Sequence, residues 1–431
     1  MKDNQAKYPQ LRFKCFTDPW EQRKLGKMGY TFTGLSGKTK EDFGHGNAKF
    51  VTYMNVFSSP VSNSEMVENV EVDSKQHQVE YGDVFFTTSS ETPQEVGMSS
   101  VWLETAENIY LNSFCFGYHP MVEFDPYYLA FMLRSPVIRK KFMLLAQGIS
   151  RYNISKNKVM EMLVPVPEIV EQQKIGSFFK QLDDTITLHQ RKLAKLKELK
   201  QGYLQKLFPK NGSKFPQLRF AGFADAWEQR KLTEIVNRVN KSSNSDVLPK
   251  VEFEDIVSGE GRLNKDISSK LDSRKGTLFE SENILYGKLR PYLKNWLFPD
   301  FEGVALGDFW VFEATDVSVP SFDYYLIQSD DYRKVANDTS GTKMPRSDWK
   351  NVSSTDFAIP SKDEQKQIGA FFKQLDDTIT LHQRKLEKLQ ELKKGYLQKM
   401  FCWFLIWSNL GSYETPWLNF YCAWSILNSL V

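Results

Sequence analysis

Two stretches of the chain carry apolar side chains at spacings that alternate between four and three residues. Eight of the ten such positions from Ile175 to Leu207 are apolar or aromatic, and the pattern recurs from Ile368 to Met400. This spacing is a heptad seam, typical of a long helix that packs against another helix. Neither stretch contains proline, so each predicts a helix of about ten turns, roughly 55 Å at 1.5 Å per residue. The central seam positions are Phe179, Leu182, Ile186, His189 and Leu193 in the first stretch and Phe372, Leu375, Ile379, His382 and Leu386 in the second.

The two stretches are near-copies of each other. Residues 178–208 and 371–401 agree at 27 of 31 positions and share "FFKQLDDTITLHQRKL". Two similar openings lie upstream, "YPQLRFKCFTDPWEQRKL" from Tyr8 and "FPQLRFAGFADAWEQRKL" from Phe215. The chain therefore repeats one plan: a short opening, a variable stretch and a long helix. The predicted parts are a first domain at 1–165, a long helix at 166–208, a linker at 209–214, a second domain at 215–360, a second long helix at 361–401 and an apolar extension at 402–431.

A helix of this length cannot bury its stripe alone. Its nearest partner is the other copy, because the roughly 150 residues between the copies allow an antiparallel pairing. We expect this intramolecular pair, while an isolated helix or an intermolecular dimer remains the alternative. His189 and His382 are polar interruptions of the seam, and we expect them to set its register or to be satisfied within the interface.

The variable stretches, residues 25–165 and 232–360, mix short apolar runs with Gly, Asn, Ser and Pro turn signals, and each contains a helical patch. This pattern is typical of α+β domains. The predicted fold class is therefore α+β, with two pseudo-symmetric α+β domains separated by two long antiparallel helices that form a coiled coil.

Composition changes this picture little. The chain has 431 residues, 41% hydrophobic and 25% charged, with a net charge of +3, and its four cysteines form no Cys-x-x-Cys pair. A reducing cytoplasm, no disulfide framework and no membrane span are expected. The long segments 171–208 and 364–401 carry +4 and +3, so the rest of the chain sums to −4. A nucleic-acid surface would therefore have to be a local patch.

Basic loops at similar places in the two variable stretches supply such a patch. "GISRYNISKNK" and "SGTKMPR" both precede the Pro-terminated segment before a long helix, and "YGKLRPYLK" adds to the second. Arg and Lys bind phosphates or guanine edges, Asn reads base edges and Tyr stacks. One such residue alone is typical of a solvated loop, but their recurrence favours DNA contact. The candidate DNA-binding residues are Lys38, Lys40, Arg151, Tyr152, Asn153 and Lys156 in the first domain and Lys288, Arg290, Tyr292, Lys294, Thr342, Lys343 and Arg346 in the second.

Catalytic motifs are missing from the sequence. Gly37-Lys38-Thr39 resembles the end of a phosphate-binding loop, but Phe32 stands where that motif needs its first glycine. The five histidines do not cluster at metal-ligand spacing. Neighbouring aspartates such as Asp183 and Asp184 point about 100° apart on a helix and do not share one substrate. We expect no catalytic residue, metal or cofactor in this chain.

With its two variable domains, its near-identical long helices and its SGTKMPR-type loop, the chain from residue 8 to 401 closely resembles the specificity subunit of type I restriction-modification enzymes. The resemblance implies two target-recognition domains, each reading one half of a bipartite site in double-stranded DNA. It also implies that the helices space these domains and dock two methyltransferase subunits. Restriction subunits, which combine motor and nuclease, would join that core, and S-adenosylmethionine, ATP and Mg²⁺ would belong to the partner chains.

The segment after Phe401 departs from this family, with four Trp, no Lys or Arg and the single charge of Glu414. We expect a non-homologous extension, with a membrane anchor as the alternative, and expect its apolar surface to pack on the helices or to promote association. Two other classes of function stay open: a coiled-coil scaffold without DNA specificity, and an enzyme with an unrecognised site.

Overall fold

The computed structural model describes residues 7–268, 273–339, 343–401, 403–405 and 417–418. The chain divides into two compact units, residues 1–190 with 384–431 and residues 191–383. Both divisions fall inside the long helices α5 (Ile169–Leu207) and α10 (Lys362–Phe401), so each unit holds one domain and a half of each helix. The predicted long helices are confirmed.

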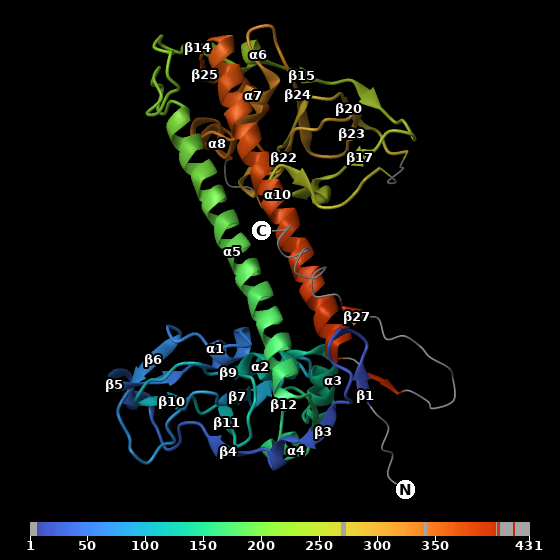
Figure 1. Ribbon diagram of the computed structural model, residues 1–431. Coiled ribbons are helices and arrows are strands. Elements are labelled where there is room, and N and C mark those ends of the chain that lie inside the picture. The colour runs from blue at the N-terminus through green and yellow to red at the C-terminus, as the bar shows by residue number, and fades with distance from the viewer. Residues whose placement is uncertain (1–6, 269–272, 340–342, 402, 406–416, 419–431) are drawn as a thin grey trace. The chain divides into compact units, whose positions relative to one another are not determined.

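The domain of the first unit is built around a four-stranded sheet in the order β4-β11-β7-β9 (Figure 1). A three-stranded sheet, β10-β5-β6, lies in the same domain. The strands are β4 (Gly29–Thr33), β5 (Phe43–Val51), β6 (Val67–Val70), β7 (Val84–Thr87), β9 (Ser99–Val101), β10 (Ile109–Leu111) and β11 (Cys115–Pro120). The helices are α1 (Tyr53–Ser58), α2 (Pro126–Arg134), α3 (Pro136–Leu145) and α4 (Lys156–Met160).

The domain of the second unit repeats the four-stranded order as β15-β24-β21-β22 and adds the sheet β16-β20-β23-β17 and the hairpin β18-β19. The shared order confirms two α+β domains of one plan. The strands are β15 (Val236–Val239), β16 (Ser242–Ser243), β17 (Lys250–Val251), β18 (Ile256–Val257), β19 (Arg262–Leu263), β20 (Gly276–Phe279), β21 (Ile284–Gly287), β22 (Trp296–Leu297), β23 (Gly303–Ala305) and β24 (Phe309–Ala314). The helices are α6 (Leu232–Ile235), α7 (Pro320–Leu326), α8 (Asp330–Ala336) and α9 (Trp349–Ser354).

Each domain is closed by a strand pair just before its long helix begins. In the first unit β3 (Glu21–Lys24) pairs antiparallel with β13 (Leu163–Val166), and in the second β14 (Glu228–Lys231) pairs antiparallel with β25 (Asp356–Ile359). Both opening strands have the sequence EQRK. The repeated opening is therefore the strand that anchors the start of each long helix.

The two long helices pack antiparallel within each unit. In the first unit Phe178 meets Tyr396 with 5.1 Å between ring centroids. In the second unit Tyr203 meets Phe371 at the same 5.1 Å, with the repeat partners exchanged between the helices. The first unit also pairs Asp183 with Lys393, and the second pairs Lys200 with Asp376. Rising residue numbers on α5 thus meet falling numbers on α10 within each unit, which confirms the intramolecular pair.

The two seams are not buried equally. Phe179, Leu182, Ile186, His189 and Leu193 are all buried on α5. On α10, Phe372 and Leu386 are buried, but Leu375, Ile379 and His382 are only half-buried. Identical seam residues therefore meet different surroundings in the two units.

An Arg–Glu ion pair joins each opening to its helix. Both partners are buried in the first unit, whereas in the second Glu364 is buried and Arg219 is half-buried. The Arg12 guanidinium donates through Nε and Nη2 to the Glu171 carboxylate, both at 2.7 Å, and Trp20 Nε1 donates to the same carboxylate at 2.9 Å. Arg219 makes the same two-pronged contact with Glu364, at 2.8 and 2.7 Å. A paired, two-pronged geometry offsets the cost of burying these charges.

The openings also hold the end of the other long helix. The Leu11 backbone N–H donates to the Lys399 carbonyl at 3.1 Å, and the Leu218 N–H donates to the Lys206 carbonyl at 2.9 Å. The last carbonyls of a helix lack intrahelical donors, so these bonds satisfy groups that would otherwise be unpaired. Each opening therefore fixes the start of one long helix and the end of the other.

The extension at 402–431 is described only at β26 (Trp403–Leu405) and β27 (Trp417–Leu418), and the rest of it lies outside the described residues. These strands pair with β1 (Lys7–Pro9) and β2 (Arg12–Phe13) of the opening. Among the described residues, no helix combines the length and the apolar character that crossing a membrane requires.

We predict that Glu171→Ala lowers the free energy of unfolding by about 3–5 kcal/mol, because it leaves the Arg12 guanidinium buried without a counter-charge. Urea unfolding followed by tryptophan fluorescence measures the change. Glu198→Ala, on an exposed position of α5, is the control and should stay within about 0.5 kcal/mol of the parent. Equal behaviour of the two variants contradicts a stabilising role for the ion pair.

Candidate nucleic-acid interface

A short hairpin projects the predicted residues of the first domain. Gln147 and Asn153 exchange two backbone hydrogen bonds, of 2.9 and 2.8 Å, and β12 (Tyr152–Asn153) pairs with β8 (Ser89–Ser90). Gly148 has φ of 139°, and a Cβ there would lie 2.0 Å from the Arg151 carbonyl oxygen. Only glycine fits this turn, so residues 148–151 form a fixed tip.

The structure brings four predicted residues together at this hairpin. Arg151 and Asn153 are exposed, Tyr152 is half-buried, and Lys156 is the half-buried first residue of α4. The sequence analysis missed Ile149, whose side chain is 96% exposed at the tip. An isolated apolar residue carries no periodic signal, and only its place between Gly148 and Ser150 in a turn-rich stretch indicates exposure.

The second domain builds the corresponding surface from two loops. The backbone N–H of Arg290 donates to the Pro345 carbonyl at 2.7 Å, and that of Ser347 donates to the Lys288 carbonyl at 2.9 Å. Leu289 forms a β-bridge with Arg346, as Ser89 pairs with Asn153 in the first domain. The predicted equivalence of the loops is confirmed. Thr342 lies outside the described residues.

Charges on this second surface are partly neutralised. Arg346 donates to both carboxylate oxygens of Asp308 at 3.2 and 3.0 Å, and Lys288 lies 3.7 Å from the same group. The hydrogen bond from Arg346 lowers the pKa of Asp308, while burial opposes that shift. Arg290, Tyr292 and Lys343 are exposed, and among the described residues no carboxylate lies within 4.0 Å of Arg290 or Lys343. Among the described residues of this surface, Arg290 and Lys343 are thus cations without a carboxylate within 4.0 Å.

Lys294 does not join this surface. It lines a pocket together with residues of α5, α8 and α10 in the second unit. Its backbone has φ of 57°, in the left-handed region that non-glycine residues seldom adopt. Lys294 is therefore assigned to the pocket lining and not to the paired loops.

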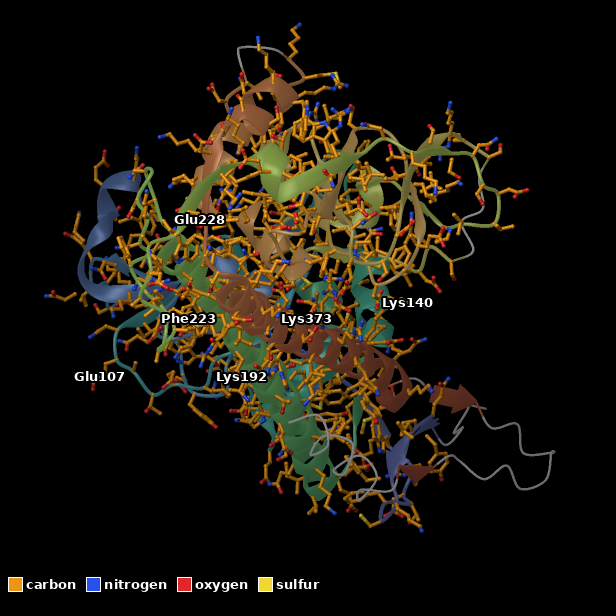
Figure 2. All side chains as sticks on the ribbon, turned by 90° about the horizontal axis from the view of Figure 1, so that it is seen from above. Glu107, Lys140, Lys192, Phe223, Glu228 and Lys373 are labelled. Carbon is orange, nitrogen blue, oxygen red and sulfur yellow. The ribbon has the colours of Figure 1, made fainter. Side chains whose placement is uncertain are left out.

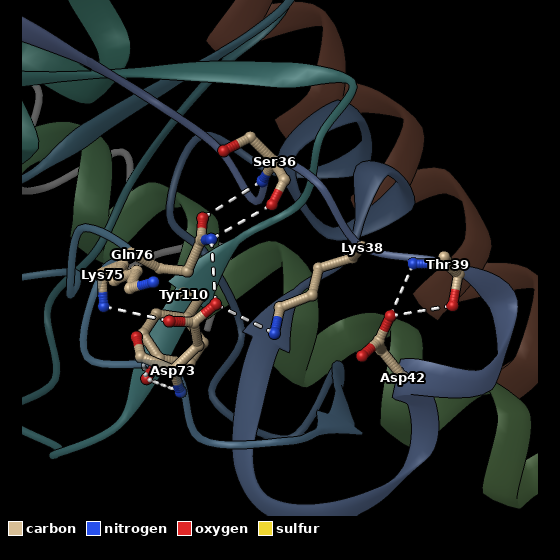
Figure 3. Close-up of polar contacts among 8 residues, drawn as sticks. All are labelled: Ser36, Lys38, Thr39, Asp42, Asp73, Lys75, Gln76 and Tyr110. Carbon is tan, nitrogen blue, oxygen red and sulfur yellow. Dashed lines mark hydrogen bonds and ion pairs between the residues drawn. The ribbon is translucent and has the colours of Figure 1, made fainter.

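Lys38 is engaged in an ion pair within the first domain (Figure 3). Its Nζ lies 3.0 Å from Asp73 Oδ2, and its side chain is 12% exposed. The backbone N–H of Lys75, together with Lys38 and Gln76, lowers the pKa of Asp73 to about 2. Thr39 and Asp42 form a capping box next to it, so this segment is a helix start and Lys40 is its exposed first residue.

The neighbouring aspartates of α5 each pair with a lysine. Asp183 pairs with Lys393, whereas Asp184 pairs with Lys180 at 2.7 Å, so the neighbouring carboxylates do not converge. In the described part of the chain, no group of three or more His, Cys, Asp or Glu side chains could hold a metal ion.

Two domains of one topology, each with a paired-loop surface and each anchored to a shared pair of long helices, define a modular recognition protein. The family described as "Type I restriction modification DNA specificity domain" matches residues 17–198 and 224–391. The chain belongs to this family, and its two domains are target-recognition domains of a type I restriction-modification specificity subunit.

Similar proteins agree with this assignment. The HindI specificity subunit of Haemophilus influenzae is 25% identical over 189 residues, covering 41% of this chain and 40% of the relative. The MjaVIII specificity subunit of Methanocaldococcus jannaschii is 24% identical over 264 residues, covering 56% and 62%. The matches therefore span less than two thirds of these relatives.

Solved structures share the fold. The S subunit of a type I restriction-modification system from M. genitalium superposes with a TM-score of 0.59 at 14% identity, covering 92% of this chain and 99% of that one. A chain from a structure that describes assembly and conformational transition of the type I system superposes with a TM-score of 0.51 at 16% identity, covering 89% and 97%.

We predict that Lys38→Met raises the pKa of Asp73, because one of its donors is lost, but leaves it below the ordinary value, because the Lys75 N–H remains. In the parent, the stabilising contribution of Asp73 is complete above the unfolded-state pKa of about 3.9 and is lost as pH falls toward 2. In Lys38→Met the loss is complete at a higher pH. Carboxyl NMR titration measures the shift.

Lys40→Met is the matched control, since Lys40 is exposed on the same segment. It should leave the Asp73 titration unchanged. If the Asp73 titration is also unchanged in Lys38→Met, Lys38 does not bind this carboxylate. Lys38 would then be available to contact DNA.

Proposed function

We propose that this chain reads a bipartite site in double-stranded DNA, with one half-site for each target-recognition domain, and that it has no catalytic role of its own. The observation that carries the proposal is the same paired-loop construction in both domains with different side chains on it. Asn153 in one domain corresponds to Arg346 in the other. One scaffold with two sets of contact groups suits two different half-sites.

The chemistry of the two surfaces supports this division. The second domain offers Arg290 and Lys343, which suit phosphates or guanine edges. The first offers Asn153, which suits adenine, next to the exposed apolar tip of Ile149. Apolar contacts suit the thymine methyl group or a wedge between base steps. Lys38 and Lys40 are proposed only as peripheral contacts.

The repeated helices would dock two copies of one partner, the methyltransferase subunit. Residues 178–193 and 371–386 are identical, so exposed members such as Leu188 and Leu381, at 42% and 53%, present the same chemistry twice. Lys192 on α5 and Lys373 on α10 are further exposed side chains of these helices (Figure 2). Restriction subunits would complete the assembly, and S-adenosylmethionine, ATP and Mg²⁺ would be bound by the partner chains in a cytoplasmic complex.

Charge variants of the second loop surface test DNA contact. Arg290→Ala and Lys343→Ala should each weaken DNA binding by the assembled complex, and each phosphate contact removed lowers the salt slope by about 1. Asp308→Asn should strengthen binding, because it releases Arg346 and Lys288 from a carboxylate. The measurement is DNA affinity across a salt series.

Lys334→Ala, an exposed cation on α8, is the control and should not change the affinity. The assignment of this surface is contradicted if Asp308→Asn does not raise the DNA affinity and if neither Arg290→Ala nor Lys343→Ala lowers it.

Helix length tests the spacing role. Seven residues inserted after position 190 and seven after position 383 keep the heptad seam and lengthen both helices by about 10 Å. The unread gap of the target should grow by roughly three base pairs at 3.4 Å per step, while both half-sites stay the same. Single-molecule sequencing of methylated genomic DNA reads the motif, and an unaltered gap contradicts the proposal.

A further inference from the structure

The second unit contains a pocket between its domain and its halves of the long helices. Its volume is about 180 Å³, several times the roughly 30 Å³ share of one water molecule. The charged side chains that line it are five cations and two carboxylates: Lys197, Lys200, Arg262, Lys294, Arg333, Glu260 and Asp376. The lining therefore has more positive than negative charge.

Both carboxylates are already occupied. Glu260 pairs with Lys197 and with Arg262, each at 2.7 Å. Asp376 pairs with Lys200 at 2.8 Å and also accepts a hydrogen bond from the Tyr325 hydroxyl at 2.9 Å. Neither carboxylate is left to neutralise the two remaining cations.

Those two cations are Lys294 and Arg333. Arg333 Nε is buried, and the described residues offer it no hydrogen-bond acceptor. The nearest carboxylate is that of Asp330, 3.7 Å from Nη1, which also pairs with Lys210 at 2.9 Å. In the described residues Lys294 has no ion pair within 4.0 Å. Burial, followed by repulsion from Arg333, lowers its pKa, and attraction to Asp330 opposes that shift. Two like charges held together in this way are costly unless an anion joins them.

The first unit shows how the same position is satisfied when no ligand is needed. Helix α3 begins after the N-cap Ser135 and α8 after the N-cap Ser329, so Arg139 and Arg333 are both the fourth residue beyond the cap. Arg139 donates to the backbone carbonyls of residues 94, 96 and 97 at 2.6–2.9 Å. In the second unit the corresponding guanidinium faces the pocket instead.

We propose that this pocket binds a phosphoryl group through Lys294 and Arg333. A phosphate dianion supplies the acceptor that Arg333 Nε lacks and the counter-charge that Lys294 lacks, and it adds to the distant Asp330 carboxylate beside Arg333. The side chains of Gln201 and Thr380 also line the pocket and can donate to the remaining oxygens. Bound there, the anion joins α8 to the halves of α5 and α10 in this unit. The proposal concerns a site apart from the loop surface and does not depend on half-site reading.

Isothermal titration of the full chain with inorganic phosphate at low salt tests the site, with chloride held constant. The parent should bind saturably near one equivalent and gain thermal stability in proportion to the logarithm of phosphate concentration. Lys294→Met and Arg333→Met should each bind at least tenfold more weakly. The control Lys334→Met, one residue from Arg333 but exposed and outside the pocket lining, should bind like the parent.

A second readout separates this role from a structural one. Without phosphate, Lys294→Met should be at least as stable as the parent, because it removes a repelled charge. If Lys294 instead had a structural role, Lys294→Met would be less stable than the parent without phosphate. Arg333→Lys, which keeps the charge but loses the Nε donor, should bind with intermediate strength and shows whether loss in Arg333→Met reflects misfolding.

The source of the phosphoryl group is distinguished with a DNA duplex. If it belongs to the DNA backbone, phosphate competes with the duplex, and Lys294→Met weakens duplex binding. If the phosphoryl group belongs to a free phosphate compound, neither added phosphate nor the Lys294→Met substitution changes duplex binding. Absence of saturable phosphate binding in the parent, or equal binding in the parent and both Met variants, overturns the proposal.

Discussion

The apolar stripe of each long helix has to be covered, and the rest of the architecture follows from the way the two copies cover each other. Within each unit, α5 and α10 run antiparallel and pair aromatic residues at equivalent positions, as Phe178 does with Tyr396 and Tyr203 with Phe371. Each domain is then fixed to this pair by an Arg–Glu contact to a buried glutamate and by a backbone bond to the other helix's last turn. A repeat kept nearly identical is what such reciprocal packing requires.

Much of this architecture was predictable because it is encoded locally. Heptad spacing predicts the helices and their pairing. The repeat of the EQRK opening was also visible in the sequence, and the structure adds that it forms the strand paired with the segment before each long helix. The loops at 148–156 and 343–346 were predicted to be equivalent from their position before the long helix, and backbone pairing confirms it.

Other features depend on tertiary contacts that no local pattern carries. Leu375, Ile379 and His382 are less buried than their copies because identical helix residues meet different domain surfaces in the two units. The pairing of Arg346 with Asp308 joins positions 38 residues apart, so composition alone overstated the basic character of that loop. Tertiary contacts likewise set the surroundings of two predicted lysines. Lys38 pairs with Asp73, and Lys294 lines a pocket.

If two domains of one plan read two separate half-sites, the DNA target has to be bipartite. The most direct measurement is single-molecule sequencing of genomic DNA from cells that express this chain with its cognate methyltransferase subunit. We expect one methylated motif with two different specific halves and an unread gap of fixed length. A methylated motif that is continuous, or no motif that depends on this chain, would contradict it.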